Sequence, residues 1–300
     1  MAFTATDVRN LRERTGCGMM DCKKALAASD GDMEKAVEFL REKGLAAVEK
    51  KASRIAAEGL VVAMIEGKVG VVLEVNAETD FVAKNETFAA FVNNVAKTII
   101  KENPADVEAL MSLHCENTEM TVQEALTDRI QVIGENMKIR RFVRMEGDLV
   151  AYVHQGGKIG VLVKFDTDCA GKDGFAAAAK DVAMQVAFSN PDYASREDVP
   201  ADVVAKEKEL LTAQVVNEGK PAAIAEKIVN GRIGKYFQEV CLLEQPFVKE
   251  EKQTVAEYMA ACAKEMGGSM TAVAFVRMEK GEGLEKREDN FADEVASMVK

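Results

Sequence analysis

Apolar positions in the first fifty residues recur with a helical period. The positions that define this period most clearly are Met33, Val37 and Leu40. Glycine-containing turns at Gly16-Cys17-Gly18 and Asp30-Gly31-Asp32 divide the segment 4–44 into three helical stretches. Gly44 predicts the end of the third helix, and a charged connecting helix is expected over Ala46–Glu58. The pattern therefore predicts a small three-helix module and a linker.

Runs rich in valine and isoleucine follow, and they occur twice. Leu60–Ile65 and Val69–Val75 flank a glycine turn, which is typical of a β-hairpin. A similar pair of runs, Leu149–Val153 and Ile159–Phe165, occurs later in the chain, where Gly160 matches Gly70 at an offset of 90 residues. The same two-stranded unit is therefore predicted at two places in the chain.

Two further matches indicate that more than the hairpin is duplicated. The sequence FVRME occurs at Phe142–Glu146 and again at Phe275–Glu279, an offset of 133 residues. The runs TVQEAL at Thr121–Leu126 and TVAEYM at Thr254–Met259 share this offset. We therefore predict an α+β fold with a duplicated core of antiparallel sheets and helices, in which each copy ends in the FVRME strand.

A helical insertion makes the second copy longer than the first. The offset is 87 residues at the alanine-rich helices that begin with Phe88 and Phe175, so the later offset of 133 leaves 46 additional residues before Thr254. Two amphipathic segments, Asp202–Glu218 and Pro221–Glu239, fill this interval and predict an antiparallel helical hairpin. Such an arm suits an intermolecular contact, and a purely structural flap is the alternative.

The end of the chain has an apolar stripe at helical spacing within Asp289–Lys300. This helix is expected to dock either on its own core or on a partner. The patterns together divide the chain into a three-helix domain at 1–50, a first core repeat at 51–146, a second core repeat at 147–282 with the insertion near 190–242, and a C-terminal helical module at 283–300.

Composition and charge narrow the class of protein. With 300 residues, of which 48% are hydrophobic and 30% charged, the chain can form a substantial core. A formal net charge of −11 and the absence of tryptophan argue against direct nucleic-acid binding, because that needs a basic surface and stacking aromatic rings. No leader pattern or membrane-length apolar run is present, so a cytoplasmic protein without membrane contact is expected. The six scattered cysteines form no CxxC pair and predict buried thiols.

The sequence lacks the motifs of nucleotide chemistry and of catalysis. Neither GxxxxGK[ST] nor a GxGxxG run after a strand occurs. The two histidines, His114 and His154, stand apart from any recognisable set of metal ligands or nucleophiles. We therefore expect a protein that is not an enzyme and that holds no cofactor or metal.

One loop, within Glu74–Phe88, fits neither the strand nor the helix pattern. Composition alone favours a structural reading, in which Asp80 caps the next helix and Phe81 lies in the core. In the functional reading, the aromatic ring wedges into another protein while the carboxylate competes for donors or disturbs a metal site. The second copy has Asp168-Cys169-Ala170-Gly171 here, without an acidic–aromatic pair. It supports the functional reading, because a feature lost in one copy is not needed by the shared fold.

Several long motifs resemble those of the bacterial elongation factor Ts family. They are RTGCGMMDCKKAL at Arg14–Leu26, KKASRIAAEG at Lys50–Gly59, ETDFVAKN at Glu78–Asn85 and EKIVNGRIGKYFQE at Glu226–Glu239. The resemblance covers essentially the full length of the chain. It implies a guanine-nucleotide exchange factor that binds GDP-bound elongation factor Tu, displaces its magnesium ion and promotes GDP release, so that GTP binds.

The resemblance also implies roles for individual segments. Residues 1–50 would form a ubiquitin-associated-like domain that docks on the GTPase, and the inserted hairpin a coiled coil that contacts the partner or joins a second copy or heterodimer. The residues carried over by position are Thr79, Asp80, Phe81 and Val82 for magnesium displacement, and Leu11, Arg12, Met19 and Met20 for docking.

A different class of protein stays open from the residues alone. A ubiquitin-associated-like adaptor or a ribosome-associated scaffold without exchange activity would explain the helical module and the acidic charge. It does not explain the Asp80–Phe81 pair or the duplicated core.

Overall fold

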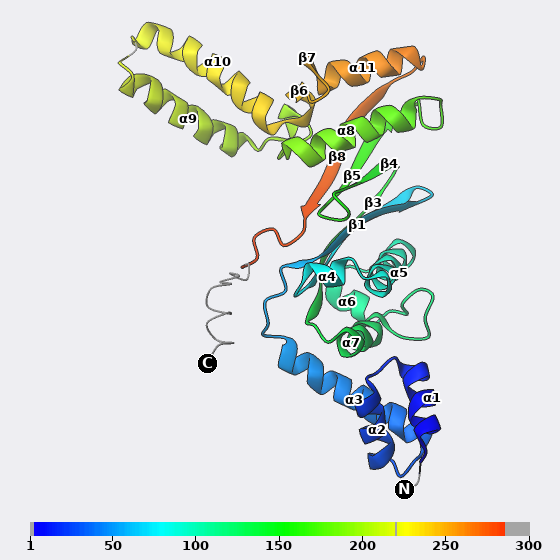
Figure 1. Ribbon diagram of the computed structural model, residues 1–300. Coiled ribbons are helices and arrows are strands. Elements are labelled where there is room, and N and C mark those ends of the chain that lie inside the picture. The colour runs from blue at the N-terminus through cyan, green and yellow to red at the C-terminus, as the bar shows by residue number, and fades with distance from the viewer. Residues whose placement is uncertain (1–2, 220, 286–300) are drawn as a thin grey trace. The chain divides into compact units, whose positions relative to one another are not determined.

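The chain forms two three-stranded sheets, with strand orders β1-β2-β3 and β4-β5-β8, and a two-stranded sheet β6-β7, all combined with helices (Figure 1). The computed structural model describes residues 3–219 and 221–285. Contacts between residues divide the chain into two compact units. The first unit comprises Met1–Val62, Leu73–Phe142 and the segment that begins at Glu279, and the second comprises Ala63–Val72 and Val143–Met278. The predicted α+β class is confirmed.

The N-terminal module consists of three helices, as predicted. They are α1 (Ala5–Thr15), α2 (Met19–Ala28) and α3 (Met33–Lys51). Gly16 ends α1 with a left-handed φ of 68°, and the Asp32 carboxylate accepts from the first amides of α3, Glu34 N at 3.0 Å and Lys35 N at 3.1 Å. Both predicted turns are therefore confirmed. The fully buried residues of the module's core are Leu11, Cys22, Ala25, Leu26 and Ala36.

The predicted end of the third helix at Gly44 is wrong. Helix α3 continues through Gly44 to Lys51, and the expected connecting helix exists only as this extension. A Cβ at Gly44 would lie 2.7 Å from Gln131 Oε1 and 3.3 Å from Thr127 Cγ2 of α7 (Val122–Ile133), so this glycine allows two helices to approach closely. The residue type that sequence reasoning takes as a stop signal serves here as a packing residue.

The first core repeat follows the predicted order of elements. Its elements are β1 (Glu58–Glu66), β2 (Val69–Ala77), α4 (Asp80–Ala83), α5 (Glu86–Glu102), α6 (Val107–Met111), α7 (Val122–Ile133) and β3 (Met137–Glu146). The central strand β2 is buried at every position after Val69. Helix α5 buries one apolar face, and the Asn85 side chain caps its start by accepting from Thr87 N at 2.8 Å.

The second core repeat has the same plan with additions. Its elements are β4 (Asp148–His154), β5 (Ile159–Thr167), α8 (Phe175–Ser189), η1 (Arg196–Asp198), α9 (Ala201–Asn217), α10 (Ala222–Val240), η2 (Leu242–Glu244), β6 (Pro246–Phe247), β7 (Glu250–Thr254), α11 (Val255–Glu265) and β8 (Met270–Glu279). Strands β4 and β5 pair antiparallel from Asp148 opposite Phe165 to His154 opposite Ile159.

Equivalent residues occupy equivalent positions in the two repeats, which confirms the duplication. The two FVRME runs end β3 and β8. The two TVxE runs form capping boxes, in which Thr121 and Glu124 begin α7, and Thr254 and Glu257 begin α11. The repeated motifs therefore form the same helix start and the same final strand in both repeats.

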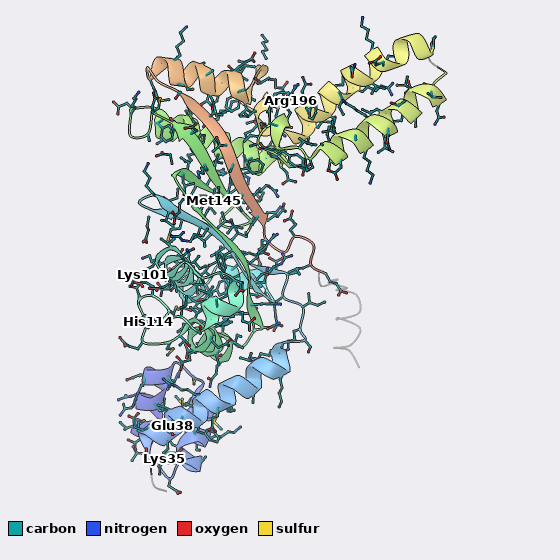
Figure 2. All side chains as sticks on the ribbon, turned by 180° about the vertical axis from the view of Figure 1, so that it is seen from behind. Lys35, Glu38, Lys101, His114, Met145 and Arg196 are labelled. Atoms are coloured by element: carbon teal, nitrogen blue, oxygen red, sulfur yellow. The ribbon has the colours of Figure 1, made fainter. Side chains whose placement is uncertain are left out.

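The inserted segment forms a two-helix arm, as predicted, in which α9 and α10 lie side by side (Figure 1). The arm has its own apolar cluster of Leu211, Val215, Val229 and Ile233. This cluster is separate from the core of the second repeat, which α8, α11 and β5 build. Arg196 lies at the base of the arm (Figure 2). It donates to both carboxylate oxygens of Glu244, at 2.7 and 2.6 Å.

We expect the replacement of Asp202–Glu239 by a short Gly/Ser linker to leave a folded protein. The two helices bury their apolar residues mainly against each other, and the bonds that close the base, such as Tyr193 N to Val240 O at 3.0 Å, are retained. A flexible linker changes the free energy of unfolding by only about 1 kcal/mol. Thermal unfolding followed by circular dichroism tests this expectation. Loss of the cooperative transition would contradict it and would make the arm part of the core.

A buried carboxylate of the first unit, Glu74, binds the segment that follows β8. Glu74, which is fully buried on β2, accepts from Gly281 N at 2.8 Å, Asn76 Nδ2 at 3.0 Å and Arg141 Nε at 2.6 Å. Arg140 Nη1 also donates to both oxygens of Glu74, at 3.0 and 3.1 Å. Burial alone raises the pKa of Glu74, but the hydrogen bonds from Gly281, Asn76 and the two arginines outweigh it and lower the pKa. A sequence segment more than two hundred residues away is thus fixed beside β2.

Within residues 3–219 and 221–285, none of the helices combines the length and apolar character that a membrane span requires. The predicted C-terminal helix over Asp289–Lys300 lies outside the described residues.

Candidate functional site

The Asp80–Phe81 pair lies on a single helical turn that leaves the end of β2. Thr79 is the N-cap of α4, and Asp80 is the first helical residue. The Phe81 side chain is 79% exposed, whereas the neighbouring Val82 is only 5% exposed. The structural reading, with Asp80 as a cap and Phe81 in the core, is therefore wrong. An aromatic ring that is exposed to this degree is accessible to another molecule.

Lys84 pairs with the Asp80 carboxylate on the exposed side of this turn. Its ammonium group donates to Asp80 Oδ2 at 2.6 Å and lies 5.9 Å from the centroid of the Phe81 ring. The hydrogen bond from Lys84 lowers the pKa of Asp80 below its ordinary value, so the carboxylate is ionised at neutral pH. The turn therefore presents an ionised carboxylate, paired with Lys84, beside a flat aromatic ring.

The four residues predicted to act on the partner have different surroundings. Asp80 and Phe81 face outward, but Val82 is buried under the turn. Thr79 is half-buried, and both its amide and its hydroxyl donate to the Glu135 carboxylate, at 3.0 and 2.7 Å. Two of the four residues thus support the turn, and only the other two are available to a partner as side chains.

Of the four predicted docking residues of the module, three have exposed side chains and one is buried. Met19 and Met20 are 51% and 63% exposed at the start of α2, and Arg12 is exposed on α1. Leu11, in contrast, is fully buried in the core of the module. The Leu11 side chain is therefore not available to a partner, because it packs between the helices that hold Arg12 and the two methionines. An exposed methionine pair offers a flexible apolar surface.

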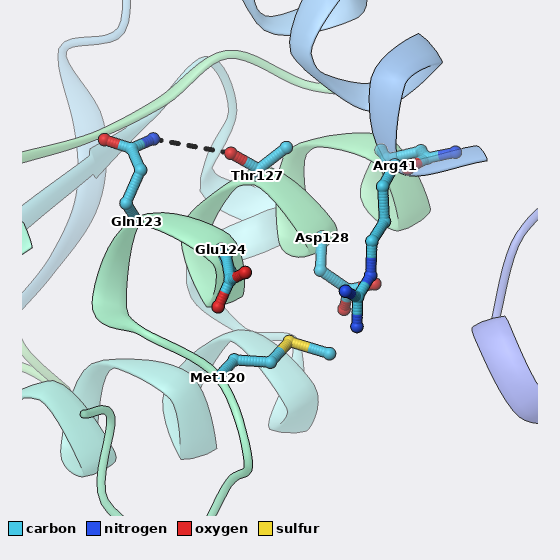
Figure 3. A pocket seen from close by; sticks show the side chains of 7 residues that line it. Arg41, Met120, Gln123, Glu124, Thr127 and Asp128 are labelled. Carbon is cyan, nitrogen blue, oxygen red and sulfur yellow. Dashed lines mark hydrogen bonds between the residues drawn. The ribbon is translucent and has the colours of Figure 1, made fainter. Parts of the chain in front are cut away.

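A small cavity of about 160 Å³ lies where α3 packs on α7 (Figure 3). Its lining residues are Arg41, Met120, Gln123, Glu124, Thr127, Asp128 and Gln131. Burial raises the pKa of Asp128, although Arg129 Nη2 lies 2.8 Å from its carboxylate. The cavity is smaller than sites that take drug-sized ligands, which are roughly 300–1,000 Å³. We therefore assign it to the seam between the module and the first repeat.

No group of three or more His, Cys, Asp or Glu side chains in the described part of the chain is arranged to hold a metal ion. All six thiols are free; five are buried and Cys262 is half-buried.

Sequence reasoning did not identify two residues that contact the Asp80–Phe81 turn, Lys84 and Glu135. The signal for Glu135 was present in the repeat alignment, because the position 133 residues later is Gly268.

Fold and site together define a two-repeat α+β protein that presents one acidic–aromatic turn and a separate exposed methionine pair. The family model described as "Elongation factor TS" matches residues 78–282. An elongation factor Ts from Syntrophotalea carbinolica is 51% identical over 100% of both chains. Those from Trichlorobacter lovleyi and Clostridium novyi are 49% and 52% identical, and cover 99% and 97% of this chain and 98% and 97% of their own.

The chain belongs to the elongation factor Ts family. It is a nucleotide-exchange factor of translation elongation, and the family implies elongation factor Tu as its partner. The adaptor or scaffold without exchange activity is thereby set aside.

Proposed function

We propose that the chain binds GDP-bound elongation factor Tu and inserts Asp80 and Phe81 beside the nucleotide site of that GTPase. The single observation that supports this proposal best is the exposure of Phe81 on a turn whose neighbours Thr79 and Val82 are held in place. A ring fixed in this way displaces partner side chains without first losing conformational entropy of its own. The turn occurs in only one of the two repeats, as expected for a functional addition to a shared fold.

Magnesium is the proposed target of the turn. In GTPases, a magnesium ion bridges and neutralises the nucleotide phosphates. The turn brings the negative charge of Asp80 and the volume of Phe81 to this region, and so weakens the metal site. Binding of the factor and of nucleotide must weaken each other by the same factor, because the coupling free energy is reciprocal. The factor therefore releases GDP without choosing GTP, and the cellular excess of GTP sets the direction.

In this proposal the N-terminal module is a ubiquitin-associated-like domain, and it supplies the docking surface. Met19, Met20 and Arg12 are its accessible contact residues. We expect Met19→Ser together with Met20→Ser to weaken binding to elongation factor Tu by about tenfold, because two exposed apolar contacts are lost. The melting temperature is expected to stay the same, since both side chains lie outside the core. Titration calorimetry measures the affinity; unaltered binding would remove the docking role.

The arm is proposed to act as a coiled coil with an intermolecular contact. Leu210 and Val216 on α9 are 53% and 62% exposed, outside the cluster that joins the two helices. This surface suits elongation factor Tu or a second copy of the complex. Sedimentation of the complex with and without the arm separates the two: loss of a larger assembly indicates the second copy, and a weaker 1:1 complex indicates the partner.

In this proposal the protein performs no covalent chemistry and needs no cofactor, and it acts in the cytoplasm, where elongation takes place. The experiment that tests the function is the release of fluorescent GDP from elongation factor Tu, followed after mixing with excess GTP. We expect the full chain to accelerate release strongly at substoichiometric concentration. Binding without acceleration would contradict the proposal and would support a scaffold role.

A further inference from the structure

A carboxylate outside the Asp80–Phe81 pair fixes the base of the turn. Glu135 lies directly after α7, beyond the Gly134 that ends this helix. Its Oε2 accepts from Thr79 N at 3.0 Å, and its Oε1 accepts from Thr79 Oγ1 at 2.7 Å. The Thr79 side chain makes no capping bond within α4, although it is the N-cap residue of that helix. A residue 56 positions away in the sequence thus binds the N-cap residue, and the Thr79 hydroxyl donates to it instead of capping α4.

The two repeats show which part of this arrangement belongs to the shared fold. In the first repeat, Asn136 N donates to Glu78 Oε1 at 2.6 Å. In the second repeat, Ser269 N donates to Asp168 Oδ1, also at 2.6 Å. The two pairs are equivalent, because Ser269 follows Asn136 by 133 residues and Asp168 follows Glu78 by 90 residues. A carboxylate at the end of the second strand therefore holds the start of the final strand in both copies.

The contact between Glu135 and Thr79 has no counterpart in the second repeat. The equivalent residues there are Gly268 and Cys169. A Cβ at Gly268 would lie 2.1 Å from Asp168 Oδ1 and 2.6 Å from Cys169 Sγ, so this repeat has no room for a side chain at the position. The acidic residue and its threonine partner therefore occur together only in the repeat that has the exposed Phe81.

Such a contact has a physical purpose in a helix as short as α4. Four residues are far too few for a helix to be stable by itself. Bonds from Lys84 N to Phe81 O at 3.2 Å and from Asn85 N to Val82 O at 2.9 Å close the turn, while buried Val82 holds its middle. The Glu135 carboxylate holds the N-cap residue, Thr79, by two charge-assisted hydrogen bonds. The direction in which Phe81 leaves the surface is then fixed from both sides.

We propose that Glu135 is a positioning residue for nucleotide exchange, which holds Thr79 so that Asp80 and Phe81 project in one conformation. This inference rests on the proposed function of the Asp80–Phe81 pair. Glu135 itself need not touch the partner, and its effect is on the population of the competent turn. A population effect is expected to lower the maximal exchange rate more than the affinity, because the N-terminal module supplies binding contacts that do not depend on the turn.

The first test compares Glu135→Gln, Glu135→Ala and the charge-matched control Glu119→Gln, which changes an exposed glutamate of the same unit. Glutamine retains one acceptor oxygen for the two donors of Thr79, and alanine retains none. We expect the maximal rate of GDP release to fall about threefold with glutamine and about tenfold with alanine, because hydrogen bonds to charged groups are of this strength. The control is expected to match the wild type, and the factor concentration at half-maximal rate to change little.

The second test needs no partner protein. Hydrogen exchange followed by mass spectrometry reports the amides of residues 79–85 in the free chain. We expect these amides to exchange about tenfold faster in Glu135→Ala, while peptides of α5 keep their protection. Thr79→Val, which removes only the hydroxyl, is expected to act in the same direction, and Thr79→Ser to restore wild-type behaviour.

The outcomes separate this inference from the function on which it rests. If Phe81→Ala abolishes stimulation but Glu135→Ala changes neither GDP release nor amide exchange, the positioning role is wrong and the function stands. If Phe81→Ala leaves stimulation intact, the proposed function fails, and amide exchange still decides whether Glu135 orders the turn. A third outcome would also overturn the proposal. If Glu135→Ala loses protection from hydrogen exchange throughout the chain, while Thr79→Val changes neither the exchange of residues 79–85 nor the rate of GDP release, Glu135 contributes to general stability and does not position the turn.

Discussion

Phe81→Ala is expected to lower the maximal stimulated rate of GDP release by about a hundredfold while the melting temperature stays unchanged. A central aromatic contact in an interface contributes roughly 2–4 kcal/mol, and each 1.4 kcal/mol is about a tenfold change. The ring is 79% exposed, so the folded chain loses almost no packing when it is removed. Stopped-flow release of fluorescent GDP and differential scanning calorimetry measure the two quantities.

Two phenylalanines of the same chain serve as controls for this prediction. Phe188, on α8 of the second repeat, is 77% exposed and outside the Asp80–Phe81 turn, so Phe188→Ala should leave the maximal rate of release unchanged. Phe88 on α5 is fully buried, and its truncation should cost about 3–5 kcal/mol of unfolding free energy. A Phe81→Ala variant that behaves like Phe88→Ala, with normal stimulation per folded molecule, would show that the ring acts in stability alone.

Most of the helices and strands could be predicted from local sequence signals, because the same motifs occur in both repeats. The TVxE capping boxes and the FVRME strands are set by contacts within a few residues, and these contacts recur in both copies. Gly44 was misread because its role is tertiary. A glycine between two apolar stretches has the same appearance whether it ends a helix or lets another helix approach, and only the position of Gln131 decides.

The site was predictable in part for a similar reason. The absence of an acidic–aromatic pair in the second repeat identified Asp80 and Phe81 as additions to the shared fold. A resemblance by position assigns a role to a residue but does not indicate whether its side chain is accessible. Leu11 and Val82 were therefore predicted to contact the partner together with their exposed neighbours, although both side chains are buried in the structure. Glu135 lies 56 residues from Thr79, and no local pattern connects the two.

Loss of the buried carboxylate Glu74 is expected to lower the stability of the fold strongly. In Glu74→Ala, the guanidinium groups of Arg140 and Arg141 and the amide of Gly281 lose Glu74 as an acceptor in a partly buried position, and only the arginines keep a second acceptor, Glu282. Breaking one side of a buried ion pair costs about 3–5 kcal/mol. We expect the free energy of unfolding in urea to fall by about this amount. The segment that follows β8, around Gly281, should also lose protection in hydrogen exchange, because Glu74 accepts from Gly281 N.

The same carboxylate predicts the direction of the pH dependence. Its hydrogen bonds lower the pKa of Glu74 in the folded protein below the ordinary glutamate pKa of 4.5, so the unfolded chain binds the proton first as the pH falls. The stabilisation is therefore fully present above pH 4.5 and is lost as the pH falls through the lower pKa of the folded state. Unfolding free energies measured between neutral pH and the acid transition should fall less steeply in Glu74→Gln than in the wild type, whereas Glu119→Gln should follow the wild type. Parallel curves for Glu74→Gln and the wild type would mean that another carboxylate governs the acid transition.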